Sequence, residues 1–253
     1  MTKEIPMTNP GRQRIVPLLS FGLCHSLIIN ASSLVIATVT ALCLMPVVSN
    51  ASDTNSILDQ WFSAQQNVAT WSADFTQIRE FRALAHPLTA AGKLYFSAPG
   101  DFRWELGRPA QTIALRHGDE MFVIYPALKR AERYPMGATA PRQLRDTMSL
   151  LQVGMPHSRK EFGEQFQLLS LVATNATWRL TLQPKSAGAR QMLPELQIDL
   201  ATNDFSLAAT ALVFADGSRM ENDYTNIAIN PPLDRGLFQW QPPDDFKVTS
   251  PVP

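Results

Sequence analysis

Short runs in which apolar and polar residues alternate, separated by turn residues, constrain the fold of this chain more than any other feature. After the turn at Pro99-Gly100, the apolar residues Phe102, Trp104 and Leu106 alternate with Arg103 and Glu105. A period of two places every second side chain on the same side of a strand, so such a run indicates a strand with one apolar face. Comparable runs occur at 71–81, 92–97, 111–116, 121–125, 166–172, 178–182, 196–200, 206–214 and 218–229.

Two segments have helical rather than strand-like spacing. Residues 53–70 carry apolar side chains at helical intervals behind the capping candidates Asp53 and Ser56. In 141–153, Leu144, Met148 and Leu151 share one face of a predicted helix. With about nine to eleven strands and few helices, the sequence predicts a mainly β, α+β fold. We expect one domain built on a curved antiparallel sheet or part-barrel.

The first 51 residues resemble a secretory leader. Arg12 and Arg14 precede an apolar tract that ends in Val48-Ser49-Asn50-Ala51, with small residues where a signal peptidase reads. We expect cleavage after Ala51, which leaves 52–253 as the mature domain. The alternative is an uncleaved anchor, although the stretch from Leu34 to Val48 is short for a membrane span. Both cysteines, Cys24 and Cys43, belong to the leader, so disulfides and thiolate chemistry are excluded for the mature domain.

The charge and motif content of the mature domain excludes several classes of function. It holds 19 Lys and Arg residues against 21 Asp and Glu residues, without the basic excess that nucleic-acid binding requires. His86, His117 and His157 are scattered, and neither a metal-ligand spacing nor a nucleophile motif is present. We therefore expect no enzymatic activity, no metal and no cofactor. An unrecognised hydrolase site, with a buried polar pocket, is the weaker alternative.

The apolar positions of the predicted strands carry unusually large side chains. Two short helices are too few to fill one face of a long curved sheet, so we expect an apolar cavity suited to an acyl chain. The candidate ligand-binding residues are Phe75, Leu94, Phe96, Phe102, Trp104, Trp178, Leu180 and Ile198.

Several motifs in this order resemble the periplasmic outer-membrane lipoprotein carrier family, called LolA-like. The most specific is the hairpin Gly92-x-Leu94-x-Phe96-x-x-Pro99-Gly100-x-Phe102-Arg103-Trp104. The other matching segments are Phe75-Thr76-Gln77, Gly118-Asp119 with Phe122-Val123-Ile124-Tyr125, Phe214-x-Asp216-Gly217, and Phe238-x-Trp240-x-Pro242-Pro243 with Phe246. Together they extend from about Ile57 to Val248.

The resemblance implies an incomplete β-barrel closed by a helical lid, with Leu144, Met148 and Leu151 as lid candidates. It also implies a periplasmic monomer without covalent chemistry that carries the acyl chains of lipoproteins to the outer membrane. Its expected partners are acylated lipoproteins or another lipid, an inner-membrane lipoprotein-releasing ABC transporter and an outer-membrane acceptor.

Two positions depart from the family pattern. Ala98 stands where the family commonly has an arginine before the hairpin proline, and Met121 stands where it often has tryptophan. Because that arginine is associated with opening of the lid, the departures affect the transfer mechanism more than the fold. The alternative function is therefore a module of the same fold that carries another lipid or senses lipoproteins.

Overall fold

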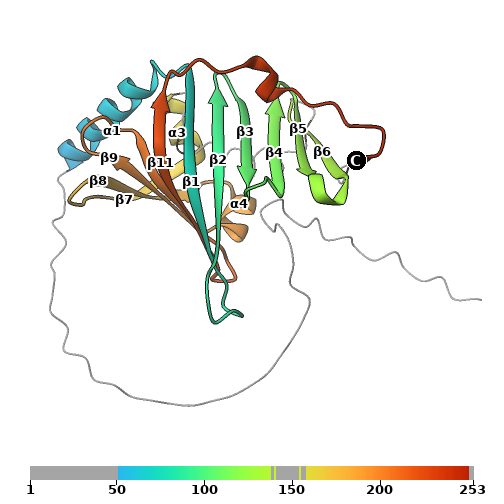
Figure 1. The fold of residues 1–253 in the computed structure, drawn as a ribbon. Helices are drawn as coiled ribbons and strands as arrows, with labels where there is room; N and C mark the ends of the chain where they lie inside the picture. Colours follow the sequence, from blue (N-terminus) through green and yellow to red (C-terminus); the bar gives the residue numbers. More distant parts are fainter. Residues whose placement is uncertain (1–50, 138–139, 141–153, 155–157, 251–253) are drawn as a thin grey trace, which may run out of the picture. The chain divides into compact units, whose positions relative to one another are not determined.

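The computed structural model describes residues 51–137, 140, 154 and 158–250. They form one large, open, curved sheet accompanied by a few short helices (Figure 1). The strands are β1 (Thr70–Glu80), β2 (Leu88–Ser97), β3 (Asp101–Leu106), β4 (Thr112–His117), β5 (Glu120–Tyr125), β6 (Arg130–Pro135), β7 (Phe166–Ala173), β8 (Thr177–Pro184), β9 (Glu195–Ala201), β10 (Leu207–Val213), β11 (Arg219–Ile229) and β12 (Lys247–Thr249).

The order of the strands is β12-β6-β5-β4-β3-β2-β1-β11-β10-β9-β8-β7. Two meanders, β1–β6 and β7–β11, are joined by pairing of the first strand with the eleventh. All neighbours are antiparallel except β12 and β6, which pair in parallel. The predicted mainly β, curved antiparallel sheet is therefore confirmed, with one parallel pair added at its edge.

A cluster of aromatic rings packs two helices, α1 (Ala51–Gln65) and α3 (Arg159–Gln165), against the start of β7. The sheet is also accompanied by the helix α4 (Ala187–Met192) and the 3-10 turns η1 (Pro126–Leu128) and η3 (Arg235–Phe238). Phe162 of α3 contacts Trp61 and Phe62 of α1 and Phe166 of β7, with ring centroids 5.4–5.5 Å apart. Trp61 is fully buried, so this cluster anchors the opening helix to the sheet.

The C-terminal segment packs against the face of the sheet that carries Phe122. Trp240 contacts the rings of Phe122 and Phe246 at centroid distances of 5.3 and 5.7 Å. Arg103 donates a hydrogen bond to the carbonyl oxygen of Leu237 at 3.2 Å. The aromatic residues near the C-terminus therefore stabilise the docking of the tail.

The structure corrects several of the predicted elements, and the short helix α4 is one that was not predicted. The first helix ends at Gln65 rather than at residue 70, because the side chain of Asn230 accepts hydrogen bonds from the backbone N–H groups of Ala69 and Thr70. The strands β6 and β12 were not predicted, since charges interrupt the apolar pattern of the first and the second has only three residues. The helix α3 was also missed, although Ser158 caps it by accepting from the backbone N–H of Glu161.

Candidate ligand-binding face

The pairing register places the predicted ligand-binding residues on a single face of the sheet. Residues directly opposite each other on neighbouring strands point to the same side. Trp71 lies opposite Phe96, which lies opposite Phe102, and the next row contains Leu94 and Trp104. We call this side, which also carries Phe75, the inner face.

The same face continues across the joint between the two meanders. Leu180 lies opposite Ile198, and Thr210, Asn222 and Gln77 continue this row from β10 through β11 to β1. Trp178 lies opposite Leu200 in the adjacent row. All eight predicted residues therefore share the inner face, although their role in ligand binding stays a prediction.

The inner-face residues differ in how far they are covered. Phe75, Phe96, Phe102, Leu180 and Ile198 are buried, whereas Leu94, Trp104 and Trp178 are partly exposed. The ring of Trp104 stacks on that of Phe75 at 5.5 Å between centroids. The partly exposed residues are thus the accessible part of an otherwise packed apolar surface. The predicted lid residues Leu144, Met148 and Leu151 lie outside the described residues.

A chain of hydrogen bonds crosses the centre of the inner face. Gln77 donates to Asn222 at 2.9 Å, and Asn222 donates to Thr210 at 3.2 Å, whose hydroxyl lies 3.3 Å from that of Tyr224. Burial raises the pKa of Tyr224 to about 12, against a smaller lowering effect of the bond with Thr210. Of these four hydrogen-bonded residues, the sequence indicated only Gln77, through the motif Phe75-Thr76-Gln77.

Arg79, near the C-terminal end of β1, extends this series of hydrogen bonds. Its Nε donates to Oε1 of Gln77 at 2.6 Å. Burial lowers the pKa of Arg79 from its ordinary value, because a low dielectric disfavours the charged form. The polar groups in this series of hydrogen bonds thus satisfy one another within an apolar surface.

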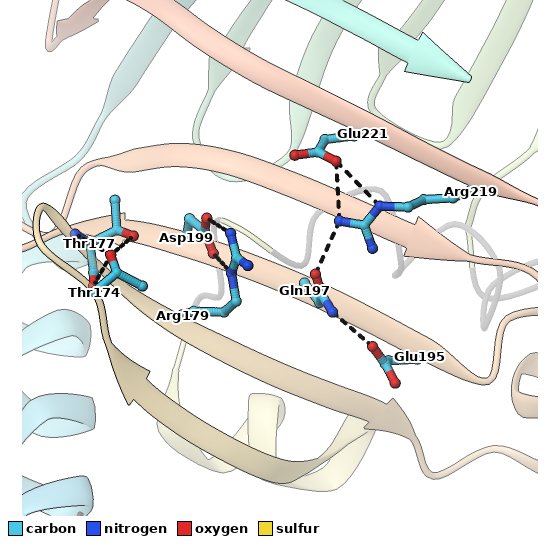
Figure 2. A network of polar contacts seen from close by, with 8 residues as sticks. All are labelled: Thr174, Thr177, Arg179, Glu195, Gln197, Asp199, Arg219 and Glu221. Carbon is cyan, nitrogen blue, oxygen red and sulfur yellow. Dashed lines mark hydrogen bonds and ion pairs between the residues drawn. The ribbon is translucent and has the colours of Figure 1, made fainter. Parts of the chain in front are cut away.

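The opposite side of the strands β8, β9 and β11, which belongs to the outer face of the sheet, is strongly polar (Figure 2). Arg179 donates to both carboxylate oxygens of Asp199 at 2.8 and 2.6 Å, and this hydrogen bonding raises the pKa of Arg179. Arg219 bridges Glu221 and Gln197 at 3.1 Å each, and Gln197 also donates to Glu195. In this half of the sheet, one face is apolar and the other is ion-paired, so the inner face is the side suited to an apolar ligand.

A small cavity lies between the C-terminal end of α1 and the inner-face residues Trp71 and Leu207. Its volume is about 80 Å³, and Val68 and Ile229 are among its lining residues. This is roughly half the volume of the apolar cavity of about 150 Å³ that admits a benzene molecule. The cavity therefore fits a small group or a chain end rather than a whole acyl chain.

The polar groups near the turn between β4 and β5 bond to one another. His117 pairs with Asp101 at 2.8 Å, and Asp101 also accepts from the backbone N–H of Gly118. This arrangement holds the turn between β4 and β5. Among the described residues, His, Cys, Asp and Glu side chains do not gather in groups of three that could hold a metal ion. Nor is any described helix both long and apolar enough to cross a membrane.

The fold and the inner face define a class of open half-barrel proteins in which one large sheet presents an apolar surface. The model of the family "Outer membrane lipoprotein carrier protein LolA" matches residues 66–241. The chain belongs to this family, and its resemblance to the LolA-like proteins is confirmed.

Curated relatives match over most of their length. An outer-membrane lipoprotein carrier protein from Coxiella burnetii is 25% identical over 210 residues, which cover 79% of this chain and 88% of the relative. A protein of the same name from Pseudoalteromonas translucida is 22% identical over 205 residues, covering 81% and 90%. The solved structure of a LolA superfamily protein from Nitrosomonas europaea has a TM-score of 0.39 at 12% identity and covers 73% of this chain and 97% of its own.

Proposed function

We propose that the mature domain carries the acyl chains of lipoproteins on its inner face, through the periplasm from the inner to the outer membrane. The observation that carries this proposal is the register that gathers eight large apolar residues on one side of the sheet. Covering an acyl chain stabilises the complex by about 0.8 kcal/mol per buried methylene. Membership of the lipoprotein carrier family supports lipoproteins as the cargo.

The proposal includes the route of the protein and its partners. Residues 1–51 act as a signal peptide and are removed, and the domain 52–253 works as a monomer without a cofactor and without enzymatic activity. An inner-membrane lipoprotein-releasing ABC transporter loads it, and an outer-membrane acceptor unloads it. Leu144, Met148 and Leu151 form the lid over the bound chains.

Native mass spectrometry of the protein purified from the periplasm tests this function. We expect a domain that begins after Ala51 and carries a co-purifying acylated lipoprotein. Leu94→Gln places a polar group on the accessible part of the inner face and should reduce the loaded fraction at least tenfold, because the amide loses water on contact with the ligand.

The matched control is Lys93→Gln, one residue earlier in β2. Lys93 lies on the outer face, where its side chain is about half exposed. Loading should therefore be unchanged in Lys93→Gln. Leu151→Asp, which places a charge in the predicted lid, should reduce loading. A wild-type protein that takes up no acylated ligand when one is offered would contradict the carrier function and favour the alternative, a module of the same fold that senses lipoproteins.

A further inference from the structure

One arginine projects from the apolar inner face at the end of β4. Arg116 lies opposite Phe102 on β3 and opposite Met121 on β5, so its side chain points to the same side as theirs. Phe102 is 8% exposed and Met121 is fully buried. The two cross-strand neighbours of Arg116 therefore offer it no acceptor, although an arginine carries five N–H donors.

The side chain of Arg116 lacks a polar partner within the described part of the chain. Its Nε is buried and forms no hydrogen bond. The guanidinium instead lies against the turn between β2 and β3, where its atoms are 3.5–3.6 Å from the position that a Cβ on Gly100 would take. Arg79, on the same face, differs because Gln77 accepts from its Nε.

The carboxylate of Glu132, which also belongs to the inner face, does not neutralise this charge. Glu132 lies opposite Val123 in the row beside Arg116, but its oxygens accept from Arg130 at 3.0 Å and from the hydroxyl of Tyr134 at 2.8 Å. A buried donor left without an acceptor destabilises the protein, because it has given up its hydrogen bonds to water. A ligand that supplies an anionic acceptor at this point would remove that penalty.

We propose that Arg116 binds the anionic headgroup of an amphiphile whose acyl chain lies on the inner face. The guanidinium fork pairs with two oxygens of a carboxylate or a phosphate, which makes arginine suited to either group. The next row of the face, with Leu94 and Trp104, receives the first part of the chain. This inference rests on the proposed function, because it needs the inner face to bind acyl chains.

Titration calorimetry with ligands of one chain length and different headgroups tests the role of Arg116. The ligands are oleate, oleoyl lysophosphatidic acid and the uncharged monooleoylglycerol, each used below its micelle concentration with the full chain. In Arg116→Gln, we expect the Kd for an anionic ligand to rise about tenfold, while the Kd for monooleoylglycerol stays unchanged. Loss for oleate alone would identify a carboxylate as the headgroup, and loss for lysophosphatidic acid alone would identify a phosphate.

Two further variants keep the test decisive. Arg116→Lys retains the charge without the fork and should recover part of the affinity, whereas Arg179→Gln removes an arginine of the outer face and should change no Kd. Equal losses for charged and uncharged ligands, or no loss for any, would overturn the headgroup role while leaving the carrier function intact. Failure of the wild-type protein to bind any of the three ligands would contradict the carrier function itself.

Discussion

Gln77 donates a hydrogen bond of 2.9 Å to Asn222 across the pairing that joins the two meanders of the sheet. Gln77 is 2% exposed and Asn222 is 7% exposed, so water cannot replace either partner readily. This contact lies within the pairing of β1 with β11, where Asn226 of β11 also donates to Asp74 of β1 at 2.8 Å. It therefore helps to fix the register of the joint, because a slip by one residue would turn the two side chains to opposite faces of the sheet and leave one amide on the apolar face without its partner.

Removing one partner of this pair should destabilise the domain. We expect Asn222→Leu to lower the free energy of unfolding by about 1–3 kcal/mol, because the buried amide of Gln77 loses its acceptor. The double variant Gln77→Leu with Asn222→Leu should lose less unfolding free energy than the sum of the losses in the two single variants. Urea denaturation measures all three variants, and Thr76→Ala, exposed on the opposite face, should stay within about 0.5 kcal/mol. Strictly additive losses would show that the two amides do not depend on each other.

The close approach of β2 to Phe75 makes Gly92 essential. A Cβ at this position would lie 2.2 Å from Cζ of Phe75 and 2.4 Å from the backbone oxygen of Glu105. Since the oxygen belongs to the neighbouring strand and cannot move freely, we expect Gly92→Ala to cost about 1–3 kcal/mol or more in denaturant unfolding.

Gly163 gives the matched comparison for that substitution. It lies within α3, and a Cβ there would have no atom within 4 Å. Gly163→Ala should stabilise the domain by up to about 1 kcal/mol, because alanine has the higher helix propensity. If both alanine variants had the same stability, the crowding around Gly92 would have no energetic consequence.

The sequence predicted the sheet well because alternation is a local signal. Phe102 and Trp104 could be assigned to one face from their spacing alone, and their cross-strand neighbours confirm it. The same rule failed for β6, where Arg130 and Glu132 occupy the inner-face positions and pair with each other. No local pattern distinguishes such a strand from a solvated basic loop, since its identity depends on pairing with β5 and β12.

The polar part of the inner face was beyond prediction for a related reason. Thr210 and Asn222 meet Gln77 because β1 pairs with the hairpin of β10 and β11, which is far from it in the sequence. Arg116 looks like an outer-face residue in its run, since a charge within a strand usually indicates solvent. Its register with Phe102 and Met121 shows that it projects from the apolar side.

The turn between β10 and β11 should make stability depend on pH in the acidic range. Asp216 accepts from the hydroxyl of Ser218 at 2.6 Å and from its backbone N–H at 2.8 Å, and these bonds lower the pKa of the carboxyl below its ordinary value. A lowered pKa means that the stabilisation is fully present above the unfolded value of about 3.9 and is lost as the pH falls through the folded value.

Comparing two variants of Asp216 isolates this contribution. Because the carboxylate is exposed and screened, we expect Asp216→Ala to lower the stability at pH 7 by only about 0.5 kcal/mol. The difference from wild type should shrink below pH 4. Asp216→Asn keeps a hydrogen-bond acceptor for the turn and should be less harmful at pH 7. Thermal unfolding between pH 3 and pH 7 measures both, and a pH-independent difference for Asp216→Ala would contradict the role of the charge.

The docking of the C-terminal segment depends on the ring of Trp240. This ring contacts both Phe122 on the sheet and Phe246 further along the tail, so its removal breaks two aromatic contacts at once. Trp240 is only partly buried, and we therefore expect Trp240→Ala to cost about 1–3 kcal/mol, less than a fully buried tryptophan would.

Limited proteolysis should show that this loss is local. Without the ring, the segment after β11 should be cleaved several times faster than in wild type, while the sheet itself stays resistant, because weakly packed segments open before the core does. Leu128→Ala is the control, since Leu128 is 68% exposed and its truncation should leave the cleavage rate unchanged. If the tail of Trp240→Ala resisted the protease as well as wild type does, the parallel pairing of β12 with β6 would hold the segment without the aromatic contacts.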